Sequence, residues 1–153
     1  MKLKRVAIGS DHRGVPLKKE LAAEMKKLGY DVLDVGPSSE DSCDYPDYAA
    51  KVGCAVQKGD CERGVVICHS GIGMSIAANK IKGVRASLCH TVEYAELARK
   101  HNDANVLAMG AGFVTPELAK KIMKAWLLTE FEGGRHEGRV QKISGYENKN
   151  SCQ

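Results

Sequence analysis

Residues 64–80 read GVVICHSGIGMSIAANK and combine a strand, a glycine turn and the start of a helix. Val65, Val66 and Ile67 form an apolar run that is typical of a buried strand in a parallel sheet. Cys68 therefore stands at the carboxyl end of a strand, which is where parallel α/β sheets bind their ligands. The open amides of the following helix N-terminus bind anions and favour the thiolate form of a nearby cysteine. The stretch predicts a reactive thiol beside an anion site.

Strand and helix patterns alternate in both directions from this stretch. Short apolar runs predict strands, and apolar residues spaced three and four apart predict helices. From Thr129 onward the sequence is polar, and a flexible tail is expected from about residue 144. The alternation predicts one α/β domain over residues 1–153, in three layers, with a doubly wound, Rossmann-like, five-stranded parallel sheet. Predicted strands cover 5–9, 31–35, 64–67, 84–88 and 106–109, and predicted helices cover 17–28, 48–58, 74–80, 92–101 and 116–128.

Length and composition exclude several classes of protein. A chain of 153 residues can bury a core without disulfides, and its six cysteines include no C-x-x-C pair, which argues against a disulfide framework and a structural zinc site. The net charge of +4 and the three Phe and Trp residues do not predict a nucleic-acid surface. The first residues lack the apolar segment of a signal peptide, and no membrane span is visible. A cytoplasmic protein is expected.

Cys68 has both a structural and a chemical interpretation. A buried, inert thiol is common at a strand end, but Ser70, Gly71 and Gly73 favour a ligand site, because glycines let the backbone approach a ligand. A phosphatase loop would need arginine where Met74 stands, and the Walker and dinucleotide motifs are absent. A thiolate beside amide donors remains, which suits abstraction of a proton next to a carbonyl while the amides stabilise the enediolate oxygen.

Three further residue pairs have two interpretations each. An Asp–His pair after the first strand either caps a helix or binds a ligand at the same sheet edge. A His–Asn pair at the end of the helix over 92–101 either terminates that helix or supplies a histidine for acid–base chemistry near neutral pH. Two arginines four residues apart are either a solvated patch or a phosphate clamp. These pairs are Asp11 and His12, His101 and Asn102, and Arg135 and Arg139.

Several motifs, in order along the chain, resemble the type B ribose-5-phosphate isomerases, a family that includes galactose-6-phosphate isomerase subunits. The resemblance implies interconversion of an aldose phosphate and its ketose through a cis-enediol(ate), with no cofactor and no metal. Ribose 5-phosphate is the expected substrate, and allose 6-phosphate, galactose 6-phosphate or a tetrulose phosphate are alternatives. The resemblance covers nearly the whole chain, up to about Ile143, and the motifs are GSDHRG at 9–14, DYPDYA at 44–49, CHSGIGMSIAANK at 68–80, RKHNDANVLAMG at 99–110 and EGGRHEGRV at 132–140.

The same resemblance implies a role for each candidate residue. Cys68 is the base, and His101 is the acid that opens the furanose ring, helped by Asp11. The loop over 69–73 surrounds the enediolate, and Asn102 holds sugar hydroxyls. Family members are homodimers or homotetramers with sites built from both chains, and the same is expected here. The implied phosphate ligands are His12, Arg135 and Arg139, and the implied substrate-binding set is Asp11, His12, His69, Ser70, Gly71, Ile72, Gly73, Asn102, Arg135 and Arg139.

The chain departs from the family pattern at two positions. His69 stands where glycine is common, and Gly112 stands where an arginine often contacts phosphate. Some members use a glutamate base at the position of Met74, and because methionine cannot act as a base, this chain resembles the cysteine type. Two other functions stay open: a non-catalytic, flavodoxin-like module that binds a sugar phosphate, and a thiol redox protein in which Cys89 approaches Cys68.

Overall fold

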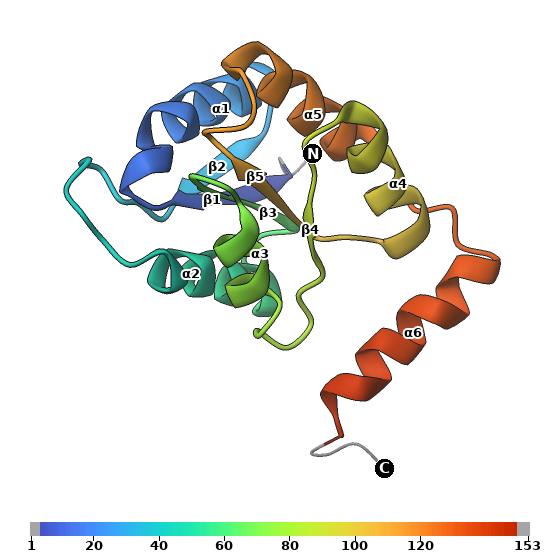
Figure 1. Ribbon diagram of the computed structural model, residues 1–153. Helices are drawn as coiled ribbons and strands as arrows, with labels where there is room; N and C mark the ends of the chain where they lie inside the picture. The colour runs from blue at the N-terminus through green and yellow to red at the C-terminus, as the bar shows by residue number, and fades with distance from the viewer. Residues whose placement is uncertain (1–3, 150–153) are drawn as a thin grey trace.

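The computed structural model describes residues 4–149 and contains a five-stranded sheet (Figure 1). The strand order is β2-β1-β3-β5-β4, and every neighbouring pair is parallel. This confirms the predicted Rossmann-like fold. The carboxyl ends of β1, β3 and β5 lie side by side, so the loops that follow these strands meet at one edge. The strands are β1 (Arg5–Ser10), β2 (Asp31–Asp34), β3 (Arg63–Cys68), β4 (Ala86–Leu88) and β5 (Val106–Gly110).

Helices cover both faces of the sheet. In Figure 1, α1, α4 and α5 lie on one face and α2 and α3 lie on the other, while α6 extends away from the sheet beyond α4. The helices are α1 (Val15–Lys27), α2 (Tyr45–Gln57), α3 (Ile72–Ala78), α4 (Val92–Asn102), α5 (Pro116–Leu128) and α6 (Arg135–Glu147), with a short 3-10 turn η1 (His12–Gly14) before α1. Within residues 4–149, no helix is long and apolar enough to cross a membrane.

The central strands are buried on both faces, and their alternating side chains divide the core in two. Val65 and Ile67 of β3 pack in the cluster that contains the fully buried Trp126 of α5. Val66 and Cys68 point to the opposite side and pack with the residues of α2 and α3. Successive side chains of a strand point to opposite faces, so β3 delivers the sulfur of Cys68 to the α2–α3 face.

The C-terminal region differs from the prediction. A polar segment after Thr129 and a tail from about residue 144 were expected, whereas α6 continues to Glu147. The polarity and the glycines of this segment weaken its helix pattern, but tertiary contacts hold it. His136 is buried against α4, and the Glu147 carboxylate accepts a hydrogen bond from the Gly83 amide at 2.9 Å. The rest of the expected tail, residues 150–153, lies outside the described residues.

Candidate active site

Cys68 is the last residue of β3, and the turn after it requires glycine. Gly71 has a φ of +78°, and a Cβ there would lie 2.6 Å from Leu88 Cδ1 and 2.7 Å from the carbonyl carbon of Met109. The turn directs the Gly71 amide at Cys68 Sγ, with an N–S distance of 3.1 Å. An amide hydrogen bond to sulfur stabilises negative charge on that atom. The local fold therefore places a donor against the thiol that the sequence singled out.

The loop after β5 holds the Cys68 turn from the other side. The Ala111 amide donates to the Cys68 carbonyl at 2.8 Å, and the Gly112 amide donates to the His69 carbonyl at 2.9 Å. Gly110 permits the close approach, because a Cβ there would lie 2.5 Å from the backbone of Ser70. The β3–β5 pairing thus continues past the ends of both strands.

A cavity of about 470 Å³ opens over this turn. Six of the predicted site residues come together in its lining, namely Asp11, Cys68, His69, Ser70, Ile72 and Gly73. Asp11 is buried, and its Oδ1 accepts a hydrogen bond from the Gly14 amide at 3.0 Å, so it caps η1 and lines the cavity at once. Ser70 Oγ accepts from the Ile72 amide at 3.2 Å. Two amides of the predicted anion site are therefore directed at Cys68 and Ser70.

Three lining residues were not predicted from the sequence: Arg13, Tyr45 and Ile76. Arg13 belongs to the same loop as Asp11 and projects from η1. Tyr45 begins α2, and a Cβ at Gly73 would lie 2.6 Å from its ring, so a glycine is needed for the ring to lie over the turn. Ile76 lies one helical turn after Ile72, a spacing that places both on one face of α3. The spacing of Ile72 and Ile76, and the position of Arg13 in the loop that contains Asp11, were the sequence signals that could have identified these lining residues.

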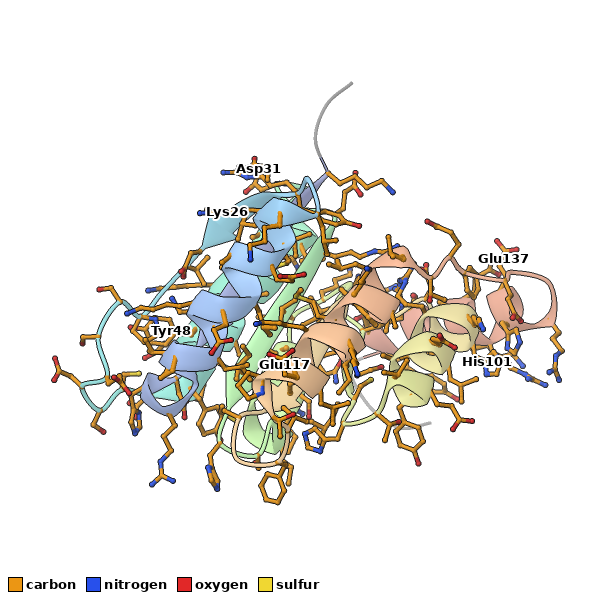
Figure 2. The ribbon with its side chains drawn as sticks, turned by 90° about the horizontal axis from the view of Figure 1, so that it is seen from above. Lys26, Asp31, Tyr48, His101, Glu117 and Glu137 are labelled. Carbon is orange, nitrogen blue, oxygen red and sulfur yellow. The ribbon has the colours of Figure 1, made fainter. Side chains whose placement is uncertain are left out.

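His101 and Asn102 are not among the described residues that line the Cys68 cavity. They are the last two residues of α4. The Asn102 carbonyl accepts a hydrogen bond at 3.2 Å from Nε of Arg85, the residue just before β4. They line a separate cavity of about 340 Å³ beside β4, which shares no lining residue with the Cys68 cavity in the part of the chain described. Figure 2 shows His101 of α4 and Glu137 of α6 on the opposite side of the molecule from Tyr48 of α2. One chain alone does not bring His101 to Cys68.

The N-terminus of α6 joins the His101 group. The rings of His101 and His136 stack with a centroid distance of 4.2 Å and an interplanar angle of 12°. Burial lowers the pKa of His136, and the positive potential of His101 and Arg135 lowers that pKa further. Arg135 and Arg139 are exposed on this helix one turn apart. The two predicted phosphate arginines therefore accompany His101 and not Cys68.

His12 is not among the described residues that line either cavity. Its Nδ1 accepts a hydrogen bond from the Cys43 amide at 3.3 Å, so the ring holds the loop over 36–44. The bond occupies Nδ1 of the ring, and the predicted contact of His12 with phosphate stays a prediction.

One side-chain group has the composition of a metal site. Ligand atoms of His101, Glu132 and His136 lie within 4.8 Å of one another. However, a metal ion lies close to the plane of each imidazole that binds it, and these two rings stack almost face to face. The observed arrangement does not fit a shared ion.

Cys89 is placed poorly for a redox pair with Cys68. It belongs to the core on the α1–α4–α5 side, whereas Cys68 packs on the α2–α3 side. Burial raises the pKa of Cys89 to about 11, so its thiol stays protonated near neutral pH. These positions give no support to the thiol redox function.

Comparison with known sequences places the chain among sugar-phosphate isomerases. The family model described as Ribose/Galactose Isomerase matches residues 6–143. "Putative sugar phosphate isomerase YwlF" of Bacillus subtilis is 50% identical over 147 residues, covering 95% of this chain and 99% of that protein. "Ribose-5-phosphate isomerase B" of Escherichia coli is 46% identical, covering 96% and 99%. "D-erythrulose-4-phosphate isomerase" of Pectobacterium atrosepticum is 42% identical, covering 97% and 98%.

Solved structures agree with the sequence relatives. Ribose-5-phosphate isomerase B of Clostridium thermocellum superposes with a TM-score of 0.94 at 50% identity and covers 96% of this chain and 99% of its own. The Mycoplasma genitalium enzyme, solved with bound ribulose-5-phosphate, has a TM-score of 0.92 at 41% identity and covers 95% and 97%. Family and fold were therefore both predicted correctly from the motifs. The chain is a sugar-phosphate isomerase that belongs to the ribose/galactose isomerase family.

Proposed function

We propose that this chain interconverts ribose 5-phosphate and ribulose 5-phosphate with Cys68 as the base. The observation that carries the proposal is the Cys68 sulfur, which accepts the Gly71 amide hydrogen bond in a cavity shared with Asp11 and Arg13. A donor on the sulfur stabilises the thiolate that proton abstraction requires. The Escherichia coli relative has this activity in its name, and the Mycoplasma genitalium structure carries the ketose product.

The reaction requires two proton transfers after the ring has opened. His101 gives a proton to the ring oxygen, and Asp11 assists by taking up the proton of the C1 hydroxyl. The Cys68 thiolate then removes the proton from C2, which leaves an enediolate, and the resulting thiol returns that proton to C1. A second proton passes from O2 to O1, so aldose and ketose have the same atoms. Amides of the loop over 69–73 stabilise the intermediate oxygen, each contributing about 3 kcal/mol.

A second copy of the chain supplies the acid. Cys68 and His101 line separate cavities in one chain. Exposed apolar side chains flank both cavities: Ile72 and Ile76 on α3 are 54% and 57% exposed, and Tyr94 on α4 is 62% exposed. Large exposed apolar residues grouped in this way favour contact with another protein surface. Pairing two copies would cover these residues and bring Asn102, Arg135 and Arg139 of one chain to the Cys68 cavity of the other.

Replacing Cys68 with alanine tests the assignment of the base. Ribose 5-phosphate turnover should fall about 10²–10⁴-fold, the range for loss of a positioned acid or base. Cys54→Ala is the matched control, because Cys54 lies on α2 and does not line the cavity. Thermal unfolding of both variants checks that the fold persists. Undiminished turnover by Cys68→Ala would show that Cys68 is not the base.

A substrate screen tests the assignment of the sugar. Aldose and ketose phosphates with four, five and six carbons should be compared by kcat/KM, and ribose 5-phosphate should give the highest value. The four-carbon substrates matter because a relative 42% identical to this chain is named for D-erythrulose 4-phosphate. A higher kcat/KM for a four-carbon or six-carbon substrate would refute ribose 5-phosphate and leave the reaction type standing.

A further inference from the structure

Gly112, in the loop after β5, lies against the exposed side chain of His69, and its own backbone does not have a positive φ. Seven described glycines have a positive φ, and Gly112 is not one of them. A Cβ at position 112 would instead collide with the imidazole of His69, 2.6 Å from Nδ1 and closer still to Cε1. The ring of His69 therefore occupies the space that any larger residue at 112 would need.

A hydrogen bond fixes the His69 backbone, and the His69 ring contacts the first member of an aromatic row. The Gly112 amide donates to the His69 carbonyl, which fixes the two residues against each other. Phe113 meets the His69 ring edge-on, with a centroid distance of 5.7 Å. Phe113 in turn stacks on His90 at 6.0 Å, and His90 Nε2 accepts from the Gly110 amide at 3.1 Å. The row therefore extends from the end of β5 to the wall of the Cys68 cavity.

The charge distribution of the cavity indicates what His69 binds. Asp11 supplies a carboxylate, and of the described lining residues, Arg13 and His69 are those that can carry a positive charge. The reacting carbons of a sugar phosphate must lie at Cys68 and the loop amides. The phosphoryl group is at the other end of the substrate, and it requires donors at a distance from the sulfur and from Asp11. His69, directed toward the β5 loop, is placed to provide one.

We propose that His69 binds the phosphoryl group of the substrate and that Gly112 is a specificity-determining position because it leaves room for the His69 ring. The proposal rests on the proposed function and assigns a side-chain role that the family pattern does not contain. The two residues act as a unit: an alanine at 112 displaces the ring, and the ring's contact with phosphate is lost even though His69 is still present.

A double-mutant cycle tests the pair. His69→Ala should raise the KM for ribose 5-phosphate about tenfold or more, as expected for loss of a hydrogen bond to a charged group. Gly112→Ala should raise KM by a similar factor. In the His69→Ala background, Gly112→Ala should change KM by less than about twofold, since residues in contact are not additive. His69→Gln retains a donor and should recover part of the affinity. Gly145→Ala is the matched control, because within residues 4–149 no atom outside the neighbouring helix backbone lies within 4 Å of the Cβ position of Gly145.

Binding of inorganic phosphate provides a readout that does not depend on turnover. Calorimetric titration should show weaker phosphate binding by His69→Ala and Gly112→Ala than by the parent chain and Gly145→Ala. Unchanged phosphate affinity with a raised KM would overturn the phosphoryl contact, and full additivity of the two substitutions would overturn the pairing. Absence of isomerase activity in the parent chain would refute the proposed function, while the phosphate titration would still decide the role of His69.

Discussion

Chains that lack Cys68 and chains that lack His101 should restore activity to each other when they form mixed dimers. In the proposed dimer, each site takes Cys68 from one chain and His101 from the other, so each single variant, Cys68→Ala or His101→Ala, would have one defect in every site. A mixed dimer has one site with both defects and one site with none. Random pairing of equal amounts makes half of the dimers mixed, so the mixture should show about a quarter of the parent activity.

The assay is co-expression of the two variants with different affinity tags, followed by tandem purification. The purified mixed dimer should have about half the specific activity of the parent, and each variant alone should have the residual activity of a site without its base or acid. Mixing two separately tagged preparations of Cys68→Ala is the control. A purified mixed dimer no more active than its parents would refute the reasoning, because it would mean that Cys68 and His101 act within one chain.

Three further results are expected from the electrostatics of the chain. The pKa of His136 is lowered in the folded chain, so the unfolded chain binds this proton more readily, and stability should fall as the pH drops below about 6.5, the ordinary pKa of histidine. His136→Gln should remove this component of the curve of Tm against pH, and an identical slope in the variant would contradict the prediction. At pH 8, mass spectrometry should show that iodoacetamide modifies Cys68 before Cys89. The raised pKa of Cys89 keeps its thiol protonated, and burial keeps that thiol from the reagent. Faster modification of Cys89 would be inconsistent with its position. Lys18 is 2% exposed, and its Nζ lies 2.7 Å from Asp34 Oδ1. Asp34→Ala leaves the buried Lys18 charge without its partner, so it should lower the free energy of unfolding by about 3 kcal/mol in urea titrations. Lys18→Met should cost less, because it leaves only an exposed carboxylate, and the reverse order would count against the argument.

The sheet could be predicted from the sequence because its strands are buried on both faces. An uninterrupted apolar run such as Val65–Ile67 is typical of a buried parallel strand when a glycine turn and a helix follow it. Helix α6 could not be predicted in the same way. Its stability depends on His136 packing against α4 and on the bond between Glu147 and Gly83, residues far apart in sequence. A local pattern does not contain such contacts.

The candidate site shows the same division. The thiol, its glycine turn and Asp11 lie at strand ends, so topology alone predicts that they meet. The separation of His101 from Cys68 depends on where α4 ends, which periodicity does not reveal. The relation between His69 and Gly112 depends on one missing methyl group, because a Cβ at 112 would lie 2.6 Å from His69 Nδ1, well inside ordinary contact. Both residues are unusual in the sequence, but the space that one takes from the other exists only in the folded chain.

The hydrogen bonds from Ala111 and Gly112 to the carbonyls of Cys68 and His69 have a consequence for how this enzyme can change. They attach the segment after β3 to the loop after β5 as if the sheet continued. The sulfur is therefore held in place as firmly as an atom of the core, although it faces a cavity. The cavity walls, in contrast, come from side chains of loops and helix ends, which substitution can reshape. New substrates can therefore be accommodated by exchanging residues around a fixed sulfur, without rebuilding the part of the fold that positions it.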